Sequence, residues 1–235
     1  MQPLVVDLYY EDLDTPDWAA IARDPRFAGA ILKFTENRHV YTPEWLKANW
    51  LPMHGVARRL GVDWFCGAYH YLRFAANIGK QVDAFLGAVK AAGDWQDGDL
   101  WPIVDVEETG NPGATAASVE DAVSAFVERV TAETGRAVML YGGSLLRDLG
   151  ITSRMGCTWL WTARYAAHLT VDDVTSMGWD EASLWGWQYQ GTGDASNRSR
   201  LVGYPALVAN YPGHPQLDLS VMTFPGGLDA LPAAL

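Results

Sequence analysis

Short apolar runs alternate with longer amphipathic segments over roughly the first two-thirds of the chain, as is typical of parallel βα units. These runs predict five strands, over Leu4–Leu8, Gly29–Phe34, Trp64–Tyr71, Trp101–Val106 and Ala137–Tyr141. After about residue 150 the intervening segments become short or rich in Gly, Pro, Asn and Ser. Three further strands are expected there, over Cys157–Ala163, Ser183–Tyr189 and Gln216–Val221. Five βα units followed by three strands indicate an irregular eight-strand barrel of the α/β class.

Helical periodicity supports the βα interpretation. Apolar residues recur every three or four positions in two segments, Ile78–Val89 and Val119–Val130, which predicts two amphipathic helices. Ser118 followed by Asp121 predicts a capping box at the start of the second helix. Further helices are expected to begin at the threonine–proline pairs Thr15-Pro16 and Thr42-Pro43, because proline suits the first helical position, and a brief helix is expected near Val171–Met177.

Composition limits the possible functional classes. With 235 residues and no linker-like stretch, we assign residues 1–224 to a single barrel domain and residues 225–235 to a loosely ordered tail. The formal net charge of -11, without any basic run, argues against a nucleic-acid binder. No apolar run is long enough to insert in a membrane, and the N-terminus lacks the features of a signal peptide. We therefore expect the protein to be made in the cytoplasm of the producing cell. We also expect it to be a monomer.

Aromatic, cysteine and histidine residues refine this picture. Eleven tryptophans and ten tyrosines are compatible with a carbohydrate groove, because flat rings stack on the apolar faces of sugars. Cys66 and Cys157 both lie in expected buried strands, which favours free core thiols over a disulfide. The five histidines show no metal-ligand spacing, so no zinc site is predicted.

Asp105 and Glu107 are the most informative residues of the chain. They lie two positions apart at the end of an apolar run, and a strand has a side-chain period of two. Both carboxylates should therefore project from one face, with Val106 turned the other way into apolar packing. Neighbouring carboxylates oppose each other's ionisation, which keeps one protonated as an acid, as sugar cleavage requires. The alternative is that two polar residues merely mark the end of a strand.

Other polar residues also end the expected strands. In parallel barrels the chemistry gathers at the carboxyl ends of the strands, so these side chains form the candidate set. If the sheet closes, carboxylates from the first, fourth and last strands meet in space. The set comprises Asp7, Lys33, Thr35, Glu36, Tyr69, His70, Tyr141, Arg164, Gln188, Tyr189 and Asp218.

Seven of these segments, taken in chain order, resemble the family 25 glycoside hydrolases, the N-acetylmuramidase lysozymes of bacteria, fungi and phages. The resemblance implies a flattened TIM-like barrel and hydrolysis of the β-1,4 bond between N-acetylmuramic acid and N-acetylglucosamine in peptidoglycan, without a metal or organic cofactor. The segments are Val6-Asp7, Ile31–Glu36, Gly67–Tyr71, Val104–Glu107, Leu160–Tyr165, Trp187–Tyr189 and Asp218.

The resemblance also implies roles for individual residues. Glu107 matches the general acid, Asp105 its partner carboxylate, and Asp7 and Asp218 the flanking acidic residues of the catalytic set. Tyr69 matches a tyrosine that lines the reaction centre. The remaining candidates for substrate binding are Lys33, Glu36, Tyr141, Trp161, Arg164, Trp187 and Gln188.

Simpler structural roles compete for several of these residues. Lys33 is expected to pair with Glu36 or another acidic neighbour in preference to substrate. His70 fits a hydrogen-bonded core histidine better than a catalyst. Arg164 suits the fixing of a carboxylate or a loop carbonyl, and the late tryptophans are divided between core and groove.

The mechanism and the functional class retain alternatives at this point. Substrate-assisted catalysis, in which the 2-acetamido group attacks the anomeric carbon, would retain configuration, whereas direct attack by water would invert it. Besides a muramidase, the Asp-x-Glu pattern fits a chitinase-type hydrolase of acetamido sugars, and a non-catalytic glycan-binding module is a third class. Without a signal peptide, a muramidase of this kind would act as an endolysin, on the cell wall after release.

Overall fold

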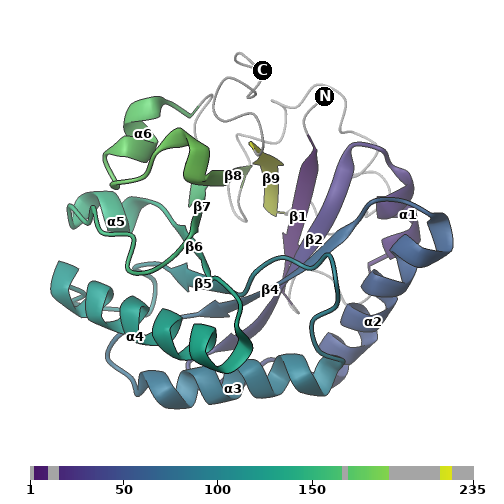
Figure 1. Cartoon of the computed structure of the whole chain (residues 1–235), viewed down its shortest axis with the longest axis horizontal. Helices are drawn as coiled ribbons and strands as arrows, with labels where there is room; N and C mark the ends of the chain where they lie inside the picture. The colour runs from purple at the N-terminus through teal and green to yellow at the C-terminus, as the bar shows by residue number, and fades with distance from the viewer. Residues whose placement is uncertain (1–2, 10–15, 166–168, 191–217, 224–235) are drawn as a thin grey trace.

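The computed structural model describes residues 3–9, 16–165, 169–190 and 218–223, and its strands form a barrel ringed by helices (Figure 1). The strand bounds agree with the apolar runs to within a few residues, and the second strand extends furthest beyond its prediction. The strands are β1 (Leu4–Leu8), β2 (Phe27–Glu36), β3 (His39–Val40), β4 (Phe65–Tyr71), β5 (Ile103–Val106), β6 (Met139–Gly142), β7 (Trp159–Ala163), β8 (Leu184–Gln190) and β9 (Asp218–Met222).

The sheet closes on itself through β1. Its strand order is β1-β9-β8-β7-β6-β5-β4-β2-β3, and β1 also pairs in parallel with β2. β9 runs antiparallel to both of its neighbours, β1 and β8, whereas the short β3 adds an extra antiparallel strand beside β2. The predicted eight-strand barrel of five βα units and three further strands is confirmed, with β3 as an unpredicted ninth strand.

Helices pack around the outside of the barrel (Figure 1). Each of the first five barrel strands is followed by a helix, as the alternating pattern predicts. Within the described part of the chain, no helix is both long and apolar enough to cross a bilayer. The helices are α1 (Trp18–Arg23), α2 (Pro43–Leu60), α3 (Ile78–Ala92), α4 (Ala116–Thr134), α5 (Ser144–Asp148) and α6 (Val171–Thr175), with a 3-10 turn at Glu181–Ser183.

Capping side chains explain where the helices begin, and they correct two predictions. α2 begins at Pro43 as expected. The start predicted at Thr15-Pro16 is wrong, because Asp17 caps α1 by accepting from the Ala20 amide at 2.9 Å; Thr15 lies outside the described residues. The capping box of α4 pairs Thr115 with Ser118, so this helix begins one turn before the predicted Ser118–Asp121 box.

The barrel strands separate two apolar layers. On β5, Val104 and Val106 face the outer layer between strands and helices, whereas Ile103 faces the inner layer that fills the barrel. The inner layer also holds Trp161 and Trp185. This alternation confirms the period of two and turns Asp105 toward the barrel axis, opposite to Val106.

Buried polar groups in the outer layer have structural roles. Cys66 and Cys157 are both free thiols and both buried, as predicted. His70 is fully buried, with its ring nitrogens 2.7 Å from the Thr35 hydroxyl and 3.1 Å from the Gln81 amide oxygen. Burial lowers the pKa of His70 to about 4, so the imidazole is neutral at pH 7. The interpretation as a hydrogen-bonded core histidine is confirmed.

Phe126 on α4 tests the importance of the outer layer for stability. Its ring is fully buried and stacks on His70 with centroids 5.1 Å apart. Phe126→Ala should reduce the free energy of unfolding by about 3–5 kcal/mol because it leaves a cavity, and lower the melting temperature by about 10 °C. Thermal melts followed by circular dichroism measure this change. Leu51→Ala, at a side chain that is 46% exposed, is the control and should change stability by no more than about 0.5 kcal/mol.

Candidate active site

Four carboxylates meet at the carboxyl ends of the parallel strands. Asp105 is on β5, and Glu107 is the first residue after this strand. Asp7 on β1 is the register partner of Asp218 on the antiparallel β9. Burial raises the pKa of Tyr69, and the negative charges of all four carboxylates raise it further. The Tyr69 phenol is therefore neutral and lies among them. The structure thus brings together all four predicted catalytic residues and the predicted tyrosine.

Asp105 and Glu107 form a coupled acidic pair. Asp105 is buried, with 5% of its surface exposed, and burial followed by the charge of Glu107 raises its pKa well above the ordinary range. Burial also raises the pKa of Glu107. Oδ1 of Asp105 has no hydrogen-bond partner among the described residues. The pair therefore holds a proton at a pH where an ordinary pair of carboxylates would both be ionised.

Lys33 acts on the acidic pair as a nearby cation, and Glu36 forms ion pairs with both Lys33 and Arg73. Lys33 Nζ lies 2.9 Å from Glu36 Oε2 and 4.5 Å from the centroid of the Tyr71 ring, and Arg73 forms an ion pair with Glu36. Burial opposes the ionisation of Glu36, but hydrogen bonds from Tyr41, Lys33 and Arg73 outweigh it and lower its pKa to about 2. Lys33 thus pairs with Glu36, as its structural interpretation predicts.

An irregularity in β2 makes the Lys33–Glu36 pair possible. Lys33 is the register partner of Tyr69 on β4, and Thr35 is the partner of the next residue, His70. Phe34 is therefore an extra residue of β2 at this point. Thr35 then bonds to His70 in the outer layer, and Glu36 returns to the side of Lys33. A regular strand would place residues three apart on opposite faces. The irregularity therefore puts Glu36 in the site.

Gln188 links Asp7 and Asp218 to two tyrosines. Its side chain is almost fully buried, and its Oε1 accepts hydrogen bonds from the hydroxyls of Tyr141 at 2.5 Å and Tyr165 at 2.9 Å. Its Nε2 donates to Asp7 at 3.1 Å and points to Asp218 at 3.5 Å. The amide is saturated by protein partners, so Gln188 acts by positioning its neighbours.

A bulge in β8 turns Gln188 toward the barrel axis. Leu160 and Trp161 are consecutive on β7, but their partners on β8 are Leu184 and Gly186, which leaves Trp185 as the extra residue. Trp185 faces the inner layer and Trp187 the outer one, although a regular strand would put both on the same face. The bulge thus exchanges the faces of Trp187 and Gln188.

The predicted groove tryptophans lie in the core instead. Trp161 is buried, donates to the Ser220 hydroxyl at 2.8 Å and contacts the Tyr141 ring at a centroid distance of 4.4 Å. Trp187 is buried in the outer layer and donates to the Arg164 carbonyl at 2.7 Å. The prediction that some of these tryptophans line the groove is therefore wrong, because Trp161, Trp185 and Trp187 are all buried in the core.

Arg164 fixes a carboxylate at the rim of the site. Its Nε is 2.7 Å from Asp173 on α6, and its backbone amide donates to the Gln188 carbonyl. Arg164 also lines a cavity of about 480 Å³ together with Glu107, Tyr141 and Tyr165. A second cavity of about 590 Å³ is lined by Arg73 and by residues 110–114. Residues 107–109 thus line the first cavity, and Gly110 and Asn111 line the second.

Sequence reasoning missed three residues of the site. Tyr71 donates to the Thr109 carbonyl at 2.7 Å and reaches Glu107 at 3.4 Å. Arg73 donates to the same carbonyl at 2.5 Å, and Tyr165 bonds to Gln188. Tyr71 could have been found, because it lies two residues after Tyr69 on one strand. The sequence holds no comparable signal for Arg73 or Tyr165.

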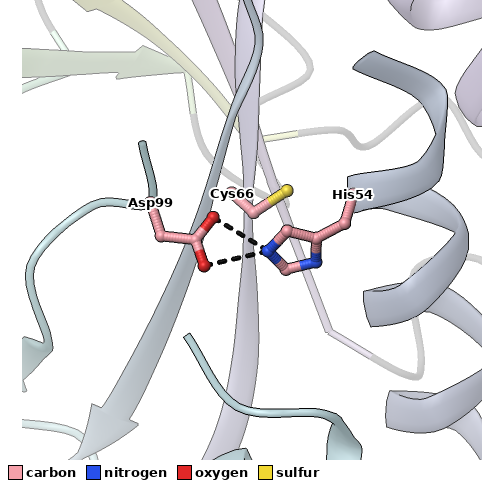
Figure 2. A group of neighbouring side chains, drawn as sticks. All are labelled: His54, Cys66 and Asp99. Carbon is pink, nitrogen blue, oxygen red and sulfur yellow. Dashed lines mark hydrogen bonds and ion pairs between the residues drawn. The ribbon is translucent and has the colours of Figure 1, made fainter. Parts of the chain in front are cut away.

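One further group of potential metal ligands lies away from this site. His54, Cys66 and Asp99 each offer a ligand atom, and these atoms all lie within 4.8 Å of one another (Figure 2). The scattered spacing of the histidines predicts no metal site. This group leaves no such signal in the sequence, because its three residues are brought together only by tertiary structure.

The family of the chain follows from a sequence comparison. The model of "Glycosyl hydrolases family 25" matches residues 16–198. The chain belongs to this family. It is therefore a glycoside hydrolase, and the matched range includes Asp105 and Glu107. Asp7 and Asp218 lie outside that range and join the site through the pairing of β1 with β9. No curated protein matches the chain.

Solved structures of the family share the fold of this family 25 hydrolase. A family 25 glycosyl hydrolase from Bacillus anthracis has a TM-score of 0.68 at 21% identity, covering 94% of this chain and 88% of that one. A muramidase from Trichobolus zukalii has a TM-score of 0.67 at 22% identity, covering 97% and 95%. The catalytic domain of endolysin ply40, from bacteriophage P40 of Listeria monocytogenes, has a TM-score of 0.63 at 18% identity, covering 94% and 93%.

Glu36→Gln tests the ion-pair arrangement beside the carboxylates. Because the pKa of Glu36 is lowered in the folded state, its stabilisation is complete above its ordinary pKa and is lost as pH falls toward about 2. At pH 6 the variant should therefore lose about 1–2 kcal/mol of unfolding free energy, a figure reduced for the partial exposure of the pair. Urea unfolding at pH 6 and at about pH 2.5 measures the difference, which should shrink at the lower pH.

The matched control for this experiment is Glu133→Gln. Glu133 pairs with Arg129 at 2.7 Å on the exposed side of α4. Such surface pairs contribute about 0.3–0.5 kcal/mol. A loss in Glu36→Gln no larger than in Glu133→Gln, or a loss that is the same at both pH values, would contradict the assigned role of Glu36.

Proposed function

We propose that this glycoside hydrolase acts as a monomer on bacterial peptidoglycan and cleaves the β-1,4 bond between N-acetylmuramic acid and N-acetylglucosamine. The observation that carries the proposal is the buried Asp105–Glu107 pair, which holds a proton beside an open cavity. Family membership and the likeness to muramidases support the choice of polymer. A glycan-binding module would gain nothing from the cost of burying two carboxylates together.

Glu107 is the general acid in this proposal. It lines the cavity of about 480 Å³, whereas Asp105 is more deeply buried and is not part of that lining. Glu107 is therefore the member of the pair that reaches a bound glycosidic oxygen. Its raised pKa keeps it protonated to a higher pH than an ordinary glutamate. Hydrolysis should accordingly fall as pH rises through that pKa.

Asp105 stabilises the reacting acetamido group. Its Oδ1 lacks a hydrogen-bond partner among the described residues, so this oxygen is available to accept a hydrogen bond from substrate. The coupled pair shares one proton, and when that proton is on Glu107 the Asp105 carboxylate is ionised. When the 2-acetamido oxygen attacks the anomeric carbon, positive charge develops on the amide, and this ionised Asp105 balances it. This is the substrate-assisted, retaining exception to the two-carboxylate scheme. No separate protein nucleophile is then required.

Asp7 and Asp218 tune the site from the opposite wall. Gln188 donates to Asp7 and points to Asp218, so both carboxylates have a fixed orientation toward the barrel axis. We assign them the positioning of water and sugar, and the maintenance of a negative field that holds the proton on the acidic pair. Tyr69 and Tyr141 complete this wall as neutral phenols, since burial raises the pKa of each.

The glycan strand lies across the two cavities. Residues 107–109 line one and Gly110 and Asn111 line the other, so successive sugars have two neighbouring hollows to occupy. Tyr165 is 50% exposed beside Glu107 and offers a ring face for stacking, and Arg164 offers polar contacts. The likeness to the catalytic domain of a phage endolysin supports a lytic role on the cell wall after release from the cytoplasm of the producing cell.

Glu107→Gln tests the assignment of the general acid. It removes the transferable proton and keeps the shape, so the rate of peptidoglycan clearing should fall by about 100-fold or more while the protein remains folded. Turbidity loss of purified cell walls gives the rate, and circular dichroism melts check folding. Glu128→Gln, at an exposed position on α4, is the matched control and should clear walls at the normal rate. Near-normal clearing by Glu107→Gln would exclude it as the acid.

Product analysis tests the cleaved bond and the stereochemistry. After borohydride reduction, mass spectrometry of the digest should show muramitol at the new termini, and proton NMR should show retained anomeric configuration. Asp105→Asn should lose most of the rate, because an amide cannot balance the developing charge. Glucosaminitol termini, or cleavage of chitin alone, would favour the chitinase-type alternative. An inverted product with Asp105 dispensable would replace substrate assistance by direct attack of water.

A further inference from the structure

His54, Cys66 and Asp99 form a cluster at the amino-terminal end of the barrel strands. His54 is on α2, Cys66 is the second residue of β4, and Asp99 lies in the loop that leads into β5 (Figure 2). The side chains of His54 and Asp99 are 5% and 3% exposed, and Cys66 is 1% exposed. Cys66 lies five residues before Tyr71, which reaches Glu107, so about 16 Å of strand separates the cluster from the catalytic end.

The hydrogen bonds of His54 fix the number of protons in the cluster. Nδ1 lies 2.8 Å from the Trp50 carbonyl oxygen, which only accepts, so Nδ1 carries a hydrogen. Nε2 lies 2.8 and 2.9 Å from the two oxygens of Asp99, as Figure 2 shows. One more proton must therefore lie between the imidazole and the carboxylate. Burial raises the pKa of Cys66, and the charge of Asp99 raises it further, so the thiol keeps its own proton.

Two of these protons occupy positions that a divalent cation can take. With them, the cluster is neutral: imidazole and carboxylate share one proton, and the thiol holds the other. Without them, Nε2, the carboxylate and the thiolate carry a total charge of minus two. A divalent cation restores neutrality, which is the condition for burying such a group at acceptable cost. The exchange is one cation for two protons, with no oxidation or reduction.

The surroundings already orient these donors as a metal site would. The second ring nitrogen of His54 donates to a backbone carbonyl, which is the usual arrangement for a metal-bound histidine. Asp99 Oδ2 accepts from the Gln96 amide at 2.7 Å, which holds the carboxylate. The buried indole N–H of Trp64, two residues before Cys66, has no hydrogen-bond acceptor among the described residues, and it favours the thiolate form of Cys66 by lowering the pKa of that thiol. A metal-bound thiolate would satisfy that N–H fully.

We infer that His54, Cys66 and Asp99 form a structural binding site for a zinc ion. Nitrogen, sulfur and carboxylate donors are the set that zinc binds in proteins, and Nε2, Sγ and one carboxylate oxygen supply three donor atoms, which leaves the fourth position to water. The ligand atoms lie within 4.8 Å of one another. A tetrahedral zinc site needs ligand separations of about 3.5 Å. Movements of about 1 Å, taken up by the loop that carries Asp99, are therefore sufficient.

The ion would join α2, β4 and the loop before β5. The bond of His54 to Asp99 already joins α2 to this loop, and the Leu100 amide joins the loop to the Cys66 carbonyl on β4. The ion would add the Cys66 side chain as a further attachment. Its effect should be on stability, because a ligand that binds only the folded state raises the melting temperature. The inference does not depend on the proposed muramidase activity, and cell-wall clearing is not its readout.

Cobalt substitution tests this site in the full chain after removal of any affinity tag and treatment with chelator. Titration with Co²⁺ should produce a near-ultraviolet sulfur-to-cobalt charge-transfer band that saturates at one ion per chain, with release of two protons in weakly buffered solution. Zn²⁺ should then displace Co²⁺ and abolish the band. The melting temperature should rise with added Zn²⁺.

Two serine variants provide the matched comparison, because the chain holds a second buried free thiol. Cys66→Ser should lose the band and bind at least about 100-fold more weakly, exceeding the 10- to 100-fold loss from an outer partner. Cys157→Ser should bind normally. Trp64→Phe, which removes only the N–H, should bind about tenfold more weakly. A wild-type chain that shows no sulfur-to-cobalt band, or a band that survives in Cys66→Ser, would overturn the inference even if that variant folds poorly.

Discussion

The active end of the barrel depends on the double pairing of β1, which joins β2 in parallel and β9 in antiparallel fashion. This pairing closes the sheet and sets Asp7 opposite Asp218, although the two residues lie near opposite ends of the chain. Closure also brings both of them close to Tyr69, where Asp105 and Glu107 lie as well. An open sheet with the same strands would leave these carboxylates at separate edges, exposed to water, with ordinary pKa values.

Neutral hydrogen-bonding groups surround the carboxylates in preference to cations. Tyr69 and Tyr141 are buried phenols beside the acidic cluster, and Gln188 is a saturated amide. Lys33 acts on the acidic pair as a cation, but Glu36 holds it and takes up much of its charge. Full neutralisation by lysine or arginine would lower the pKa of the pair and release its proton. Neutral partners therefore keep the pKa of the acidic pair raised, whereas water or a closer cation would lower that pKa and release the proton.

The sequence predicts the barrel and the central part of the site, because both rest on simple periodicities. The period of two along β5 places Asp105 and Glu107 together, and the alternation of strands and helices yields the βα units. Features that depend on register are not predictable in this way. The extra residues in β2 and β8 decide that Glu36 and Gln188 enter the site and that Trp187 leaves it. The meeting of His54 with Asp99 depends on tertiary packing, as does the contact of Arg73 with Glu36.

The bulge in β8 has a consequence for the evolution of the family. Trp185 is the extra residue, whereas Gly186 and Trp187 pair with consecutive residues of β7, Trp161 and Thr162. Loss of the single codon for Trp185 would therefore leave a regular strand in which Trp187 still faces the helices and Gln188 the barrel axis. A relative without this residue is expected to differ by a one-residue gap before the Trp-Gln-Tyr triplet, with the triplet on the same faces. The bulge is therefore an insertion that can be gained or lost without changing which residues of the triplet face the site.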